Sequence, residues 1–183
     1  GLALNATETR ALIGTTSLYF ATYTTSWSSF SATLSTTSTS TGSFTSVSLT
    51  DDGLRGVVTI GYVTNYIYFC TWNGSNYSAL TQINDSNARD YRSGHITPDG
   101  SILVTSVLGG YVYFSKWDGS NYNTLTQTLE TNVRNYVGIC ISRDGNRIAY
   151  GVDSSLGGTG LVYWADWNGT NFNSGTQTLN TTS

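Results

Sequence analysis

The segment Tyr111-Val-Tyr-Phe-Ser-Lys-Trp-Asp-Gly-Ser-Asn-Tyr122 decides the fold of this chain, because it occurs three times. Its other copies are Tyr66-Ile-Tyr-Phe-Cys-Thr-Trp-Asn-Gly-Ser-Asn-Tyr77 and Leu161-Val-Tyr-Trp-Ala-Asp-Trp-Asn-Gly-Thr-Asn-Phe172. The segment follows a period of two, which is typical of a strand whose successive side chains point to opposite faces. One predicted face carries Tyr111, Tyr113, Ser115 and Trp117, and the other carries Val112, Phe114 and Lys116. Both faces are largely apolar, which predicts a strand packed between two neighbouring sheets.

Each copy lies within a longer unit of about 45 residues, the size range of tandem four-stranded repeats. Upstream of each copy, an Asp-Gly turn precedes a short apolar strand, with the glycines at Gly53, Gly100 and Gly145. Downstream of each copy, a Thr-Gln pair follows. The first 43 residues form a weaker copy, in which Tyr23 stands where Trp72 does. The predicted repeats are 1–43, 44–90, 91–135 and 136–183.

Each unit is predicted to form four antiparallel strands, because Asp-Gly and Asn-Gly pairs between short apolar runs are typical of hairpin turns. In the last unit these strands are expected near 136–142, 147–152, 160–167 and 172–179. No segment shows a helical pattern. The predicted fold is therefore all-β, a single repeat domain (1–183) of four tandem four-stranded β-propeller-like blades. Stacking the blades buries both apolar faces of each sheet; the pattern leaves open a closed small ring, part of a larger ring, or an open stack.

The repeated pattern resembles integrin-like, FG-GAP-type propeller repeats. The resemblance is carried by Leu49-Thr-Asp-Asp-Gly53, the strand that follows it, the Trp-Asn-Gly turn after the next strand, and the Thr-Gln pair. It covers three repeats clearly and the first weakly. It implies a propeller in a secreted, surface or virion-associated protein.

The resemblance also implies candidate calcium sites, because blades of that family often bind calcium in an Asp-x-Asp-x-Asp-Gly loop. The weak candidates here are Asp51, Asp52, Asp99, Asp144 and Asp153. Calcium prefers six to eight oxygen ligands, several of them charged, and each turn offers only one or two carboxylates. Structural turns are therefore the favoured interpretation, and no metal or other cofactor is expected.

The sequence favours a protein that is not an enzyme. His95 is the only histidine, and its counterparts in the repeat are Ser48 and Cys140, so we expect it to have a packing role. Asp51 and Asp52 are adjacent turn residues and are expected to point in different directions, unlike the paired carboxylates of a glycosidase. The chain contains no Gly-x-Ser-x-Gly nucleophile motif, and Gly157-Gly158-Thr159-Gly160 lacks the lysine and helix of a phosphate loop.

Carbohydrate binding is the alternative function. The Trp-Asn-Gly turns offer aromatic rings and amides, which are groups that bind carbohydrates. Because the turn recurs in each blade, several weak sites would together bind with higher avidity. The candidate residues are Trp72, Trp117, Trp167, Tyr77, Tyr122 and Phe172. The competing interpretation, which we favour, is that the aligned tryptophans pack between blades.

Composition limits the partners. A net charge of −3, with 10% charged residues, offers no cluster of Lys and Arg for a nucleic acid backbone. No apolar run approaches the roughly 18 residues that span a bilayer. Asn-x-Ser/Thr triplets provide candidate glycosylation sites at Asn5, Asn73, Asn76, Asn84, Asn168 and Asn180, and the low-complexity run Ser35–Gly42 is predicted to be a flexible or O-glycosylated loop.

The two cysteines, Cys70 and Cys140, occupy different places in the repeat, so we expect two buried free thiols in preference to a disulfide. Taken together, these features predict a non-enzymatic structural or adhesive module that is extracellular or on a cell or virion surface. Its expected partners are copies of itself, other surface proteins or glycans. The unpaired flanks of the first and last blades favour self-association in a surface or filamentous assembly.

Overall fold

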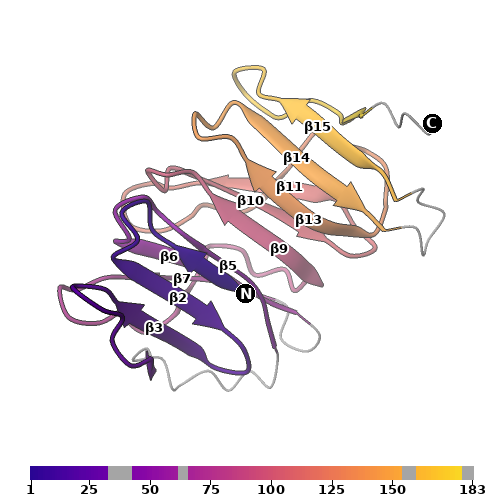
Figure 1. Cartoon of the computed structure of the whole chain (residues 1–183). Coiled ribbons are helices and arrows are strands. Elements are labelled where there is room, and N and C mark those ends of the chain that lie inside the picture. The colour runs from indigo at the N-terminus through magenta and orange to yellow at the C-terminus, as the bar shows by residue number, and fades with distance from the viewer. Residues whose placement is uncertain (33–42, 62–65, 154–159, 179–183) are drawn as a thin grey trace, which may run out of the picture.

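The chain folds into four antiparallel sheets of four strands each, and the strand order in every sheet follows the order in the sequence (Figure 1). The computed structural model describes residues 1–32, 43–61, 66–153 and 160–178, and within these ranges it contains strands and no helix. The first sheet consists of β1 (Leu2–Leu4), β2 (Arg10–Gly14), β3 (Leu18–Thr22) and β4 (Ser31–Ala32). The second consists of β5 (Ser43–Leu49), β6 (Arg55–Gly61), β7 (Ile67–Thr71) and β8 (Thr81–Gln82).

The other two sheets repeat this pattern. The third consists of β9 (Tyr91–Ile96), β10 (Ile102–Val107), β11 (Val112–Lys116) and β12 (Thr126–Gln127). The fourth consists of β13 (Tyr136–Ile141), β14 (Arg147–Val152), β15 (Val162–Asp166) and β16 (Thr176–Gln177). The predicted all-β fold of four four-stranded blades is therefore confirmed.

The turn between the first two strands of a blade forms where the sequence places Asp-Gly. In the third blade, Asp99 Oδ1 accepts hydrogen bonds from the Ser101 amide (2.9 Å) and the Thr97 hydroxyl (2.6 Å). Gly100 then adopts a φ of +71°, which is strained for residues with a Cβ. The equivalent glycines, Gly53 and Gly145, have φ values of +67° and +73°. The predicted turns are therefore present in three blades.

The fourth strand of the last blade is shorter than the sequence predicted. In the last blade the prediction extended over 172–179, but β16 covers only Thr176–Gln177. Phe172 instead pairs with Trp167 in an isolated bridge. The reason is the neighbouring blade: the Phe172 carbonyl accepts a bond from the Leu129 amide (2.9 Å), so this segment is hydrogen-bonded across to the preceding blade.

The four sheets are stacked in sequence order, with the first and fourth at opposite ends of the stack (Figure 1). The first strands β1, β5, β9 and β13 lie beside one another along the stack. Apolar side chains on both end sheets are exposed, among them Leu2 and Val162. The first and fourth blades therefore do not close into a small ring within the described residues, and both part of a larger ring and an open stack stay predictions.

The core consists of three apolar layers, one between each pair of neighbouring blades. Strand β11 serves two of them: Tyr113 packs in the layer between the second and third blades, and Val112 and Phe114 pack in the layer between the third and fourth. The predicted two-sided packing of this strand is therefore confirmed. The expectation for Cys140 is wrong, because Cys70 is a buried free thiol but Cys140 is exposed on the end of the stack.

Candidate interaction surfaces

Every blade has two distinct faces, and the same pair of faces meets at each interface between blades. We call the face toward the next blade in sequence the forward face, and the face toward the preceding blade the rear face. Three register-equivalent positions form the apolar centre of the forward face. In chain order of the blades they are Leu12, Leu18 and Phe20; Val57, Ile67 and Phe69; Val104, Val112 and Phe114; and Ala149, Val162 and Trp164.

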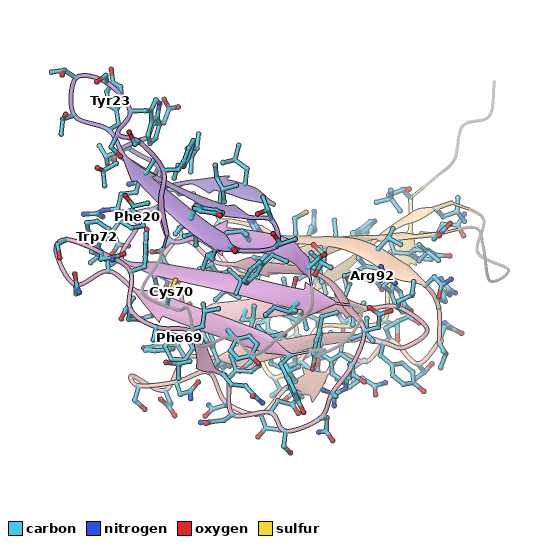
Figure 2. All side chains as sticks on the ribbon, turned by 90° about the horizontal axis from the view of Figure 1, so that it is seen from below. Phe20, Tyr23, Phe69, Cys70, Trp72 and Arg92 are labelled. Carbon is cyan, nitrogen blue, oxygen red and sulfur yellow. The ribbon has the colours of Figure 1, made fainter. Side chains whose placement is uncertain are left out.

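An aromatic contact repeats at each of the three interfaces. Phe69 on the forward face of the second blade lies edge-on to Trp117 (5.2 Å between ring centroids) and to Tyr122 (6.0 Å) of the third blade. The same geometry joins Phe20 to Trp72 and Tyr77, and Phe114 to Trp167 and Phe172. Figure 2 shows Phe20 next to Trp72, with Tyr23 at the far end of the first blade. Complete burial of a ring such as Tyr122 contributes about 1.5–3 kcal/mol.

A cation from each forward face covers the tryptophan of the next blade. The Arg55 guanidinium lies 3.6 Å from the centroid of the Trp117 ring, and the Arg10 guanidinium lies 4.8 Å from that of Trp72. In the third blade the position of these arginines is occupied by Ile102, whose register partner Lys116 places its ammonium 4.5 Å from the Trp167 ring. Such contacts are attractive because the ring face carries negative charge. Sequence reasoning missed this contact; the signal was a basic residue beginning the second strand or ending the third.

The first strands of neighbouring blades are joined by a side chain that points forward. Ser48 Oγ accepts a hydrogen bond from the Ile96 amide (3.2 Å), and His95 Nδ1 accepts one from the Ile141 amide (3.1 Å). Ala3 and Cys140 occupy the equivalent positions of the first and last blades. Burial lowers the pKa of His95, so the neutral ring that can accept this bond is favoured. The structure therefore places His95 in a contact between blades.

The forward face of the fourth blade has the same components, but no further blade packs on it within the described residues. Val162 is 48% exposed, and the exposed thiol of Cys140 lies on the same face. The Arg147 guanidinium, at the position of Arg10 and Arg55, folds back over Trp164 of its own blade (4.6 Å) and pairs with Asp166 (2.6 Å from Nε to Oδ1). A hollow of about 310 Å³, lined by Cys140, Ala149 and Val162 among others, opens on this face.

The rear face of the first blade is the complementary exposed surface. Tyr23 and Trp27 form the pair that corresponds to Trp72 and Tyr77. Trp27 is 43% exposed, whereas Tyr77 is completely buried by the preceding blade. Leu2 and Leu4 on the same face are 63% and 48% exposed. These two end surfaces are the candidate interaction surfaces of the chain.

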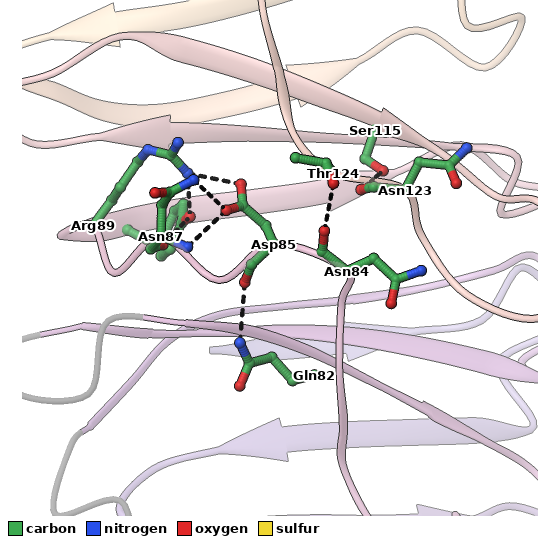
Figure 3. A network of polar contacts seen from close by, with 9 residues as sticks. Gln82, Asn84, Asp85, Asn87, Arg89, Ser115, Asn123 and Thr124 are labelled. Carbon is green, nitrogen blue, oxygen red and sulfur yellow. Dashed lines mark hydrogen bonds and ion pairs between the residues drawn. The ribbon is translucent and has the colours of Figure 1, made fainter.

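A polar network shapes the connection between blades (Figure 3). The buried Asp85 carboxylate pairs with Arg89 (2.8 Å) and accepts bonds from the amide and side chain of Asn87. Burial raises the pKa of Asp85, but these bonds lower it by more, so the carboxyl is ionised more readily than usual. The side chain of Gln82 donates to the Asp85 carbonyl (3.0 Å), which explains the repeated Thr-Gln pair. Sequence reasoning missed the network.

The next connection uses the same plan. Glu130 is buried and accepts bonds from Asn132, Tyr150 Oη (3.1 Å) and the Gly175 amide (3.1 Å). The signal in the sequence was the match between Asp85-Ser-Asn-Ala-Arg-Asp-Tyr91 and Glu130-Thr-Asn-Val-Arg-Asn-Tyr136. Both networks stabilise the crossing from one blade to the next.

Apart from the adjacent Asp51 and Asp52, the calcium candidates lie in separate segments of the chain. Asp52, Asp99 and Asp144 each accept hydrogen bonds from the hydroxyl and amide groups of their own turns. The Thr97 hydroxyl and the Ser101 amide hold the pKa of Asp99 below its usual value. Asp51 pairs with Arg143, and the Asp153 amide donates to the Asn135 carbonyl. Within the described part of the chain, no three His, Cys, Asp or Glu side chains gather at one point.

The aromatic candidates for sugar binding lie between the blades. Tyr77, Tyr122 and Phe172 are completely buried, so these three candidates of the alternative function do not face solvent in the folded chain. Each ring follows the isolated bridge that closes a Trp-(Asn/Asp)-Gly turn, and it lies in the layer between blades. Trp72, Trp117 and Trp167 are half-buried, and each has a cation over one ring face.

The glycosylation candidates differ in accessibility. Asn73, Asn84 and Asn168 are exposed and Asn76 is half-buried. Asn5 is buried, and its side-chain amide donates to Thr7 (2.9 Å) and Thr9 (3.1 Å), so it is not accessible to an enzyme in the folded chain. Asn180 and the run Ser35–Gly42 lie outside the described residues. The described residues contain no helix that is long and apolar enough to cross a bilayer.

Comparisons with known proteins support the fold. No protein family and no curated protein matches the sequence, so the resemblance to FG-GAP repeats stays a prediction. The hydrazine synthase of Kuenenia stuttgartiensis superposes with a TM-score of 0.68 at 12% identity, over 97% of this chain and 48% of that chain. A 6-phosphogluconolactonase-like protein of Bacteroides uniformis superposes with a TM-score of 0.69 at 14% identity, over 96% and 55%.

Both structures have propeller-like β folds, and the likeness at this level of identity concerns the fold alone. This chain spans about half the length of each. The superposed region therefore accounts for only part of each of those proteins.

Proposed function

We propose that this chain is a non-enzymatic structural or adhesive module of the FG-GAP type, which assembles through its end blades outside a cell or on a virion surface. The observation that carries the proposal is the exposure of both end faces. Each is one half of an interface that the chain already forms three times.

The use of the charged side chains supports a structural role. The described carboxylates that are buried, Asp85 and Glu130, are saturated by hydrogen bonds within the connections between blades. Asp52, Asp99 and Asp144 hold turns, and His95 joins two blades through its ring nitrogen. These groups have structural partners, and a catalytic role would compete with them.

The surface composition supports a location outside the cell. Only 10% of the residues are charged, and the exposed loops present hydroxyl and amide groups such as those of Asn73, Ser75 and Thr170. Exposed apolar surface on both end blades is a hazard for a free monomer, and burial in an assembly removes it.

The test measures assembly and location separately. Sedimentation velocity of the purified chain over a range of concentrations is expected to show reversible growth above the monomer. Antibodies raised against the chain are expected to label intact cells or particles of the source without permeabilisation. A chain that stays monomeric at all concentrations and is labelled only after permeabilisation contradicts the proposal.

A further inference from the structure

We propose that the partner of each end face is a second copy of this chain, docked head to tail. In this arrangement the rear face of the first blade of one copy packs on the forward face of the fourth blade of another. This inference rests on the proposed function and specifies the occupant of the two surfaces.

The apolar centres of the two end faces carry the same positions that meet at the interfaces within the chain. On the forward side, Ala149, Val162 and Trp164 occupy the positions of Val57, Ile67 and Phe69. On the rear side, Tyr23 and Trp27 occupy the positions of Trp117 and Tyr122, which Phe69 contacts edge-on. Trp164 of one copy is therefore placed to contact Tyr23 and Trp27 of the next.

The polar components also match. Arg147 has the register position from which Arg55 covers Trp117, so in the docked pair it can cover the Tyr23 ring. Its present contacts with Trp164 and Asp166 are on an exposed surface and contribute little to stability. In the docked pair Arg147 would exchange these exposed contacts for a contact with the Tyr23 ring that is shielded from water. Because a cation–π contact is stronger when it is desolvated, this exchange favours docking.

The first strands provide a third match. Cys140 has the position of Ser48 and His95, whose side chains face the amides of Ile96 and Ile141. Leu4 is the counterpart of Ile96 and Ile141 in the first blade. In the docked pair, Cys140 of one copy therefore lies next to Leu4 of the other.

A second copy is favoured as the occupant for two reasons. The two halves of the interface are both present on this chain, which makes it self-complementary in the head-to-tail sense and able to form rings or fibres. The solved structures that share its fold contain about as much chain again as it covers, which is room for a second set of four blades.

A cysteine pair tests the register. The variant Leu4→Cys is expected to form a disulfide with native Cys140 of a second copy under mild oxidation, because docking places positions 4 and 140 side by side, as Ile141 and His95 are within the chain. The bridge reports this register closely, since a disulfide requires the two Cα atoms to lie within about 4.4–6.8 Å. The double variant Leu4→Cys/Cys140→Ser and the control Leu129→Cys, an exposed leucine on the third blade, are expected to stay uncrosslinked. Peptide mapping identifies the bridge.

Mixing two variants, each altered on one end face, tests whether the copies dock head to tail. Val162→Lys damages only the forward end, and Leu2→Lys damages only the rear end; both positions are exposed, so the fold is retained, as circular dichroism can verify. Each variant alone is expected to associate at least about tenfold more weakly than the native chain, because the docked interface buries an unpaired charge. An equimolar mixture is expected to recover 1:1 dimers. Leu54→Lys, at an equally exposed leucine on the second blade, is the matched control and is expected to associate normally.

The outcomes separate the two proposals. Association that survives in both single variants, or a 4–140 bridge that does not form although the chain associates, overturns the head-to-tail inference and leaves the proposed assembly intact. A native chain that is monomeric at every concentration overturns both.

Discussion

At the level of single residues, the three interfaces between blades repeat the same contacts with different residue types. Arg10, Arg55 and Lys116 differ in type or in position, yet each places a cation over the tryptophan of the next blade. Ser48 and His95 differ in chemistry, yet each accepts a hydrogen bond from a backbone amide in the first strand of the next blade. The contact can be conserved in this way because a cation needs only to reach a ring face, and an amide needs only an acceptor.

The hydroxyl of Tyr122 is predicted to contribute only modestly to stability. It donates to the Gly100 carbonyl (2.8 Å), but Arg55 also donates to that oxygen (3.1 Å), and Phe172 fills the equivalent position without a hydroxyl. Tyr122→Phe is therefore expected to lower the free energy of unfolding by about 0.5–1.5 kcal/mol. Tyr122→Ala, which empties a buried site, is expected to cost about 3–5 kcal/mol. Urea titration measures both, and equal losses would contradict the prediction.

His95 is predicted to make stability depend on pH in weakly acidic solution. Burial lowers its pKa below the ordinary 6.5, so the unfolded chain binds a proton that the folded chain does not. The free energy of unfolding is therefore expected to fall as the pH drops below about 6.5.

The variant His95→Ser keeps an acceptor, as Ser48 does in the preceding blade, and removes the titrating group. It is expected to be flatter than the native chain between about pH 7 and about pH 5.5 in chemical denaturation. A native chain and a variant with the same slope in this range would show that His95 is not responsible.

At the level of elements, each turn and connection has its own local determinants. The Asp-Gly turns are closed by side-chain bonds within five residues, and the blade connections by a buried carboxylate and its amide partners. This local closure allows the same four-stranded unit to recur in a chain whose strands have diverged.

Gly100 is predicted to be less replaceable than Gly109, although both have positive φ values, +71° and +61°. A Cβ at Gly100 would lie 2.6 Å from Arg55 Nη1 and 2.9 Å from Thr50 Cγ2, whereas nothing lies within 4 Å of one at Gly109. Gly109→Ala is expected to cost about 1–2 kcal/mol from backbone strain alone. Gly100→Ala is expected to cost about 1–3 kcal/mol more, from crowding against Arg55 and Thr50 of the preceding blade. Thermal melts of the pair give the comparison; a Gly109 variant that loses as much as the Gly100 variant would be inconsistent with it.

At the level of the whole molecule, stability comes from the layers between blades, as in other stacked repeats. Each apolar layer combines residues of two neighbouring blades, so a blade is stabilised by its neighbours and the two end blades have only one neighbour each.

Equivalent substitutions are therefore predicted to differ between the interior and the end of the stack. Phe69→Ala opens the layer between the second and third blades and is expected to cost about 3–5 kcal/mol of unfolding free energy. Trp164→Ala, at the same register position on the exposed forward face, is expected to cost the monomer less than about 1.5 kcal/mol and to weaken self-association instead. Denaturation of dilute protein and sedimentation at high concentration measure the two effects; a Trp164 variant as unstable as the Phe69 variant would indicate a closed stack.

Much of the architecture was predictable from local signals. The period of two in Tyr111–Trp117 predicted which side chains enter which layer, and Tyr113 and Phe114 do pack on opposite sides. The Asp-Gly pairs predicted the turns at Gly53, Gly100 and Gly145. These signals are local because strand alternation and turn conformation depend on neighbours in the chain.

Other features needed the packed blades. The burial of Asn5 and Phe172, the exposure of Cys140, and the cation contacts of Arg55 all depend on what lies across an interface. Sequence reasoning placed Asn5 in a turn and Cys140 in a strand correctly, but it could not place the neighbouring sheet against these residues.

The sequence by itself determined the repeated unit, its strand alternation and its turns, because these follow from short-range sterics and from the spacing of apolar side chains. Only the tertiary structure decided that the four described blades do not close on one another, so that the rear face of the first blade and the forward face of the last are exposed. Closure depends on the rotation between neighbouring blades. That rotation is set by many packing contacts between residues far apart in the chain.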